Sequence, residues 1–280
     1  MKINYFIPRL PAKYCHGTVE QRQLKANELN SQIFERIVNQ FGSSDRCYFL
    51  DIEKILEEFL GDCTKIYFRS SKIFSRRGET KLLTKKYGVK GIKIRIPLDP
   101  YNDVNIRTIP ILMHEIGHAT LYLSNPKYII NNLKCFQGKF SKKKIWRFYN
   151  NHIYKRETAK TPEKKEQILQ DIEKGLNKIL KKYTPQERIL YLNQLRYSIQ
   201  SEINSYNLGV NFAKQLNKIY KPIINIKDVY TKDDFMFSEK LEVINKILAE
   251  TIKKERSNPE PPKRNIFLKM LDRLFFEDDE

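Results

Sequence analysis

The sequence has few cysteines and no long apolar run. Its 280 residues include four cysteines without a C-x-x-C pair, so we expect free thiols rather than a disulfide framework. These are Cys15, Cys47, Cys63 and Cys135. No apolar stretch approaches the ~18 residues that a membrane span requires, and the residues before Arg9 are too short for a secretory h-region. We therefore expect synthesis in the cytoplasm, with no membrane span and no cleaved export signal.

Acidic residues are scarce relative to basic ones: 33 Asp and Glu stand against 52 Lys and Arg, a net charge of +19. Two segments concentrate the excess. Residues 61–100 hold eleven bases and three acids, and residues 127–156 hold nine bases, no acid and seven aromatic residues. Nucleic-acid surfaces combine bases that contact phosphate with aromatic rings that stack. Nucleic-acid binding is therefore one hypothesis, and a lysine-rich solvated surface is the other.

The apolar pattern predicts an α+β fold that is predominantly helical. At 40% hydrophobic residues, the chain can form a real core. Alternating apolar and basic residues at 65–69 and 92–96 predict two half-buried strands, with a turn between them flanked by Gly88 and Gly91. After Pro110 the pattern is almost wholly helical. We expect a small sheet ahead of a helical region.

Several helix ends can be placed from local signals. Thr18 and Gln21 form a capping-box pattern, and the helix that follows is expected to bury Leu24, Ile33, Ile37 and Phe41. Asp51 is expected to cap a short helix that ends at Gly61. Thr161 and Thr184, each followed by proline, predict two further helix starts.

The chain is expected to form one domain over residues 1–256. Its sheet-containing part spans about 1–105 and its helical part about 106–256. Neighbouring prolines cannot continue a helix, so residues 257–265, which include Pro259, Pro261 and Pro262, predict a linker. Residues 266–280 form a C-terminal tail.

One five-residue motif carries chemistry: His114, Glu115, Ile116, Gly117 and His118. Residues four apart share a helix face, so both imidazoles can bind one metal ion. Glu115 follows the first ligand directly and can act as a general base on water without binding the metal. Thr108 is expected to cap this helix and Asn125 to follow its end. The competing interpretation is a helix with two incidental histidines.

The motif resembles the active-site helix of the zincin metallopeptidases. The resemblance implies a fold with a small sheet above that helix, zinc on His114 and His118, and a general base at Glu115. It also implies a peptide substrate held along the sheet edge. A metzincin would continue with Gly at 121 and His at 124, but Leu121 and Ser124 stand there. A subfamily with an aspartate ligand would have an Asp close after His118, and this sequence has none there.

A catalytic zinc needs a third protein ligand, and Glu202 is the first candidate. It is the one carboxylate on an apolar seam of the helix that starts after Thr184, where burial would be costly without a metal or a cation partner. Its surroundings are similar to the Glu-bearing helix of the gluzincins. A Lys or Arg partner is the competing explanation for Glu202. His152, Glu157 and Cys135 are weaker ligand candidates.

A peptidase also needs a donor for the developing oxyanion. Tyr206, one turn beyond Glu202 on the same face, is the first candidate, ahead of Tyr197 and His152. The sequence thus predicts a zinc endopeptidase that acts on a protein substrate. A nucleic-acid-associated protein is the alternative, and a deformylase-like hydrolase is disfavoured because its cysteine motif is missing.

The acidic C-terminal tail, with Glu277, Asp278, Asp279 and Glu280, resembles the glutamate-rich export signals of bacterial type IV secreted effectors. That resemblance implies delivery of a protease into a host cell, with a host protein as substrate. An ordinary solvated tail is the competing interpretation. A cytoplasmic peptidase of the phage or toxin–antitoxin kind, with a similar His-Glu-x-x-His helix, is a further alternative.

Overall fold

The computed structural model describes most of the chain. The described residues are 9–61, 65–71, 78–85, 88–98, 103–125, 128–129, 145, 148, 151–152, 155–156, 158–221, 224–225 and 237–257. Cys63, Cys135 and Glu157 lie outside them. So do most of the basic aromatic segment, the linker beyond residue 257 and the acidic tail, and the hypotheses that rest on these parts stay predictions.

The fold is α+β and predominantly helical, as the sequence predicts. In chain order the described elements begin with α1 (Ala12–Cys15), α2 (Val19–Phe41), β1 (Arg46–Cys47), α3 (Phe49–Leu60), β2 (Lys65–Ser71), β3 (Glu79–Lys85) and β4 (Gly88–Pro97). They continue with β5 (Val104–Asn105), the 3-10 turn η1 (Ile106–Thr108), α4 (Ile109–Ser124), α7 (Pro162–Leu180), α8 (Pro185–Ile219) and α10 (Phe237–Ser257). None of the helices among these residues is long and apolar enough to cross a membrane.

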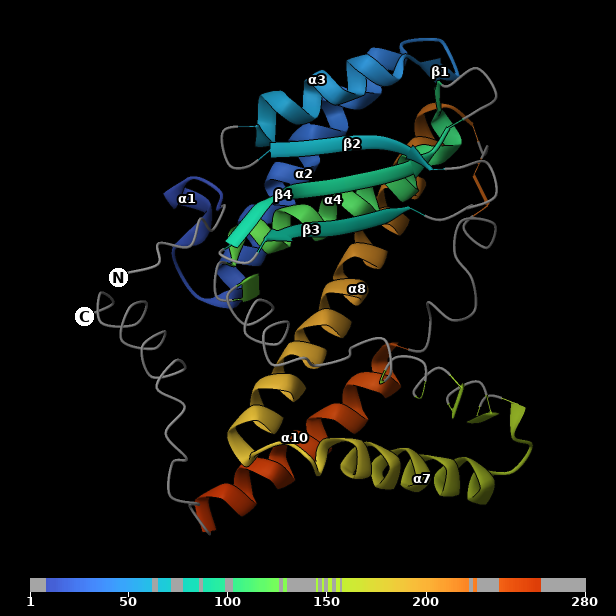
Figure 1. Cartoon of the computed structure of the whole chain (residues 1–280). Helices are drawn as coiled ribbons and strands as arrows, with labels where there is room; N and C mark the ends of the chain where they lie inside the picture. The colour runs from blue at the N-terminus through green and yellow to red at the C-terminus, as the bar shows by residue number, and fades with distance from the viewer. Residues whose placement is uncertain are drawn as a thin grey trace, which may run out of the picture.

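Three strands that precede the motif helix α4 in the chain form one sheet, in the order β2-β4-β3. β2 runs parallel to β4 and β3 runs antiparallel to it. Ile92, Ile94 and Ile96 alternate along β4 and are fully buried, because successive side chains point to opposite faces of a strand. β3 forms one edge of the sheet. In Figure 1, α2 and α4 lie behind the sheet and α3 lies along the β2 edge, where it contacts both β2 and α2.

Two hydrophobic clusters stabilise the molecule. The first joins α2, α3, β4, α4 and the C-terminal half of α8, and the second joins α7, the N-terminal half of α8 and α10. The 35 residues of α8 therefore take part in both, over a length of about 52 Å at 1.5 Å per residue. Figure 1 shows α8 running from beneath the sheet to the crossing with α10.

The helix starts at Thr18, Thr161 and Thr184 are confirmed. Each threonine hydroxyl accepts a hydrogen bond from the backbone three residues on, and Thr18 and Thr184 form complete capping boxes. The expected position of Leu24 is wrong, because its side chain is 62% exposed. Leu24 lies two residues before the buried Ala26, which places it about 200° around the helix from that face.

Three other local expectations need correction. Asp51 is not a cap: α3 begins at Phe49, and Asp51 lies in its first turn. Thr108 makes no capping hydrogen bond, because η1 leads directly into α4 and keeps Thr108 in helical geometry. Gly88 and Gly91 do not flank a turn but lie within β4. The preceding residues 79–85 form β3, which the sequence interpretation missed.

Candidate metal centre

Three side chains from two helices meet at one point. His114 and His118 lie one turn apart on α4, and Glu202 reaches them from α8. The Nε2 atoms of His114 and His118 are 3.1 Å apart. Glu202 Oε2 lies 3.2 Å from Nε2 of His118 and 3.5 Å from Nε2 of His114. Residues 84 positions apart thus form a single group that can hold a metal ion.

The spacing of the three ligand atoms fits a tetrahedral ion. With zinc–ligand bonds of about 2.0–2.2 Å, two ligands of a tetrahedron stand roughly 3.3–3.6 Å apart. The separations of 3.1, 3.2 and 3.5 Å lie close to this range. One ion just outside the plane of the triangle would contact all three atoms with little rearrangement.

A close contact between α4 and α8 brings the ligands together. A Cβ atom on Gly117 would lie 3.0 Å from both the Ser205 Oγ and the Leu208 Cδ2. Ser201, Ser205 and Gly209 are small and buried on the facing side of α8. Small residues on both helices let the backbones approach, so that Glu202 can reach the histidines.

A second contact orients His118. The Oγ of Ser201 lies 2.8 Å from Nδ1 of His118, and both side chains are buried. The ring of Tyr122 stacks against the same imidazole with a centroid distance of 6.0 Å. Because Nδ1 is engaged by Ser201, the other ring nitrogen, Nε2, faces Glu202 and His114.

Glu115 is buried beside the ligand group, with 5% of the residue exposed. Gly78 lies against its carboxyl group, since a Cβ at Gly78 would be 2.5 Å from the Glu115 Oε1. Thr80, on the edge strand β3, donates a hydrogen bond of 2.9 Å to the Glu115 backbone carbonyl. Burial raises the pKa of Glu115 to about 7, although the neighbouring His114 opposes the shift.

The two histidines dominate the electrostatics of Glu202. Burial by itself raises the pKa of this carboxyl group, but the charge of His118 and the hydrogen bonds from His114 and His118 outweigh it. The net effect is a pKa well below the ordinary range, so the group is a carboxylate at neutral pH. Its ion pairs within the described chain are with these histidines, not with a Lys or Arg.

The other candidates from the sequence occupy different places. His152 donates its Nδ1–H to the Phe148 carbonyl oxygen, 2.9 Å away, and is not part of the ligand group among the described residues. Tyr197 donates its hydroxyl to the backbone carbonyl of Leu121 at 3.3 Å. Tyr206 is half-buried on α8, one turn beyond Glu202. Its role as an oxyanion donor stays a prediction.

Comparisons with known proteins supply no family for this chain. No protein-family model, no curated protein and no solved structure matches it. The function is therefore inferred from the geometry of the site.

Sequence reasoning missed four residues that shape this site: Gly78, Thr80, Gly117 and Ser201. Gly117 lies inside the motif, so its small size was a usable signal for a close helix contact. Ser201 directly precedes Glu202, but nothing in a local pattern tells which serine reaches an imidazole. Gly78 directly precedes β3 and Thr80 lies within it. Both act through tertiary contacts, and the periodicity did not indicate this strand.

Proposed function

We propose that the chain is a zinc-dependent endopeptidase that hydrolyses peptide bonds of a protein substrate with metal-activated water. The observation that carries this proposal is the triangle of ligand atoms on His114, His118 and Glu202, with the buried carboxyl group of Glu115 beside it. Two imidazoles and one carboxylate form a donor set that zinc hydrolases use, and it leaves a coordination position open.

The donors support zinc over magnesium or calcium. Imidazole nitrogen suits zinc, whereas magnesium and calcium prefer oxygen ligands alone. Zinc in such a site supplies Lewis acidity toward water and toward a carbonyl oxygen. With Nε2 facing the metal position, Nδ1–H of His118 donates a hydrogen bond to the Ser201 Oγ, and such an outer contact fixes the ring of a metal ligand.

The chain's own residues supply the proton transfers. Glu115 takes a proton from the attacking water and later gives it to the leaving amine. The peptide bond breaks, and Glu115 is again a carboxylate that can accept the next proton. A pKa raised to about 7 by burial suits a group that must accept and return a proton near neutral pH. Tyr206 is proposed to donate a hydrogen bond to the oxyanion that develops on the scissile carbonyl.

The sheet edge supports a peptide as the substrate. β3 is the edge strand of its sheet, and Thr80 ties that strand to the backbone of Glu115. An edge strand presents unpaired backbone groups that can hydrogen-bond an extended peptide. A peptide added along β3 would therefore pass close to the general base.

Metal content and proteolysis, measured on the same preparations, test the proposal. We expect the wild-type protein to hold one zinc and to cleave an unfolded protein substrate. Glu115→Gln should keep the zinc and lose activity by at least about 100-fold, the contribution typical of a general base. Glu202→Ala should lose both. Glu242→Ala removes an exposed carboxylate from α10 and serves as the matched control.

Two results would overturn the proposal in different ways. If Glu115→Gln retains full activity, Glu115 is not the base. If Glu202→Ala still binds stoichiometric zinc with wild-type affinity, the third ligand lies elsewhere.

A further inference from the structure

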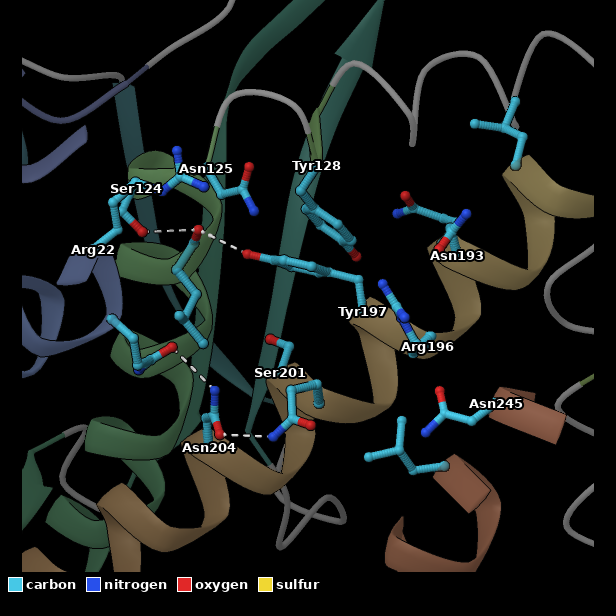
Figure 2. A pocket seen from close by; sticks show the side chains of 16 residues that line it. Arg22, Ser124, Asn125, Tyr128, Asn193, Arg196, Tyr197, Ser201, Asn204 and Asn245 are labelled. Carbon is cyan, nitrogen blue, oxygen red and sulfur yellow. Dashed lines mark hydrogen bonds between the residues drawn. The ribbon is translucent and has the colours of Figure 1, made fainter. Parts of the chain in front are cut away.

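A cavity lies next to the candidate metal centre. Its volume is about 690 Å³, and its walls come from α2, the C-terminal end of α4, the N-terminal half of α8 and α10 (Figure 2). Ser201 belongs to both places, because it lines this cavity and also contacts Nδ1 of His118. A cavity of this size falls in the range of sites for small molecules.

The side chains that line the cavity carry positive charge and no negative charge. Two arginines, Arg22 from α2 and Arg196 from α8, contribute to the lining together with seven Asn or Gln side chains, and no acidic residue does. Within the described part of the chain neither arginine forms an ion pair. Glu20, which does not line the cavity, is the acidic residue that interacts electrostatically with Arg22. A wall that carries positive charge and no carboxylate attracts an anion and repels a cation.

Part of the wall is already organised by internal contacts. Asn204 accepts a hydrogen bond from Gln200 at 3.1 Å and donates one to Gln23 at 3.0 Å. The ring of Tyr197 stacks on Tyr128 at a centroid distance of 4.0 Å. Figure 2 shows Tyr197 extending from α8 toward α4. These side chains are held in place before any ligand arrives, which lowers the entropic cost of binding.

We propose that this cavity is a second binding site, for a small anionic ligand. A carboxylate or phosphate group of the ligand pairs with Arg22 and Arg196, whose guanidinium groups suit both anions. The amide side chains of Asn193 and Asn245, which line the same cavity, bind its other polar atoms. This site is distinct from the peptidase function and does not depend on it, because none of the three metal ligands lines the cavity.

Calorimetric titration with three capped amino acids tests the proposal. The probes are N-acetyl-glutamate amide, N-acetyl-phosphoserine amide and the neutral N-acetyl-glutamine amide, at one ionic strength and with zinc-free protein. We expect saturable one-to-one binding of an anionic probe, and binding of the neutral probe at least tenfold weaker, about the effect of one charge-assisted hydrogen bond. The tighter of the two anions identifies carboxylate or phosphate as the preferred group.

Two variants locate the binding. Arg22→Gln should weaken the anionic probe about tenfold or more, and Arg196→Gln, which removes the other positive charge of the lining, should weaken it as well. Lys214→Gln is the control, because it removes one positive charge from an exposed position of α8 outside the cavity. The proposal is wrong if no anionic probe saturates, or if the neutral probe binds equally well. It is also wrong if Arg22→Gln and Lys214→Gln weaken binding to the same extent.

Discussion

Ser201 contacts His118 from the side opposite to the metal position: its Oγ lies 2.8 Å from Nδ1 of the imidazole. Ser201 directly precedes Glu202, so one turn of α8 supplies both a candidate ligand and the residue that orients another ligand. Because α8 carries both residues, we expect its position relative to α4 to affect metal affinity in two ways.

The first prediction concerns that contact. Ser201→Ala should weaken zinc affinity about tenfold, the lower end of the effect seen when an outer partner of a metal-bound histidine is removed. Competition with a zinc-binding dye measures the change. Ser205→Ala is the control: Ser205 is a buried serine one turn further along α8, and its Oγ has no hydrogen-bond partner in the described chain. Equal zinc affinities in the two variants would contradict the role given to Ser201.

A second prediction concerns the space beside the general base. In Gly78→Ala, the new Cβ would lie 2.5 Å from Cγ and Oε1 of Glu115, which is closer than unbonded atoms can stand. The carboxyl group must move, so we expect proteolytic activity to fall about tenfold or more while bound zinc stays stoichiometric. Wild-type activity in a folded Gly78→Ala protein would mean that this wall does not position Glu115.

The third prediction tests Tyr206 as the oxyanion donor. Tyr206→Phe removes only the hydroxyl and should lower kcat about 100-fold with little change in KM, because the hydrogen bond forms in the transition state. Tyr197→Phe is the matched control, since the Tyr197 hydroxyl is engaged with the Leu121 carbonyl. If the Tyr197 variant loses more activity than the Tyr206 variant, the assignment is reversed.

The sequence predicted the parts of this site that depend on helical periodicity. The four-residue spacing of His114 and His118 fixes their common face, and the apolar seam around Glu202 marked a carboxylate that needed a partner. Both inferences use one helix at a time. The structure brings these side chains within 3.5 Å of one another, although the pairing of the two helices had no local signal beyond the small residues.

The errors have a common physical origin. Thr108 fits the composition of a cap, but it is the last residue of a 3-10 turn that already has helical geometry, so its hydroxyl has no free helix end to cap. Gly88 and Gly91 fit a turn, yet pairing with β2 and β3 holds them in an extended strand. In each case a tertiary or neighbouring element overrode a local preference, and single-sequence patterns do not contain that information.

The last prediction is a pH dependence of the metal-free protein. Burial raises the pKa of Glu115 from its ordinary 4.5 to about 7, so between these values the folded state binds a proton that the unfolded state has released. The contribution of Glu115 to the free energy of unfolding therefore falls as pH rises from 4.5 to 7, by roughly 3 kcal/mol in total. Glu202 acts in a different window, because its pKa is lowered and its stabilisation is lost only as pH falls below 4.5. Glu115→Gln carries no titrating group, so urea unfolding in a chelator should show the wild type losing stability relative to this variant across pH 4.5–7. A constant difference between the two proteins over that range would mean that Glu115 titrates normally in the fold.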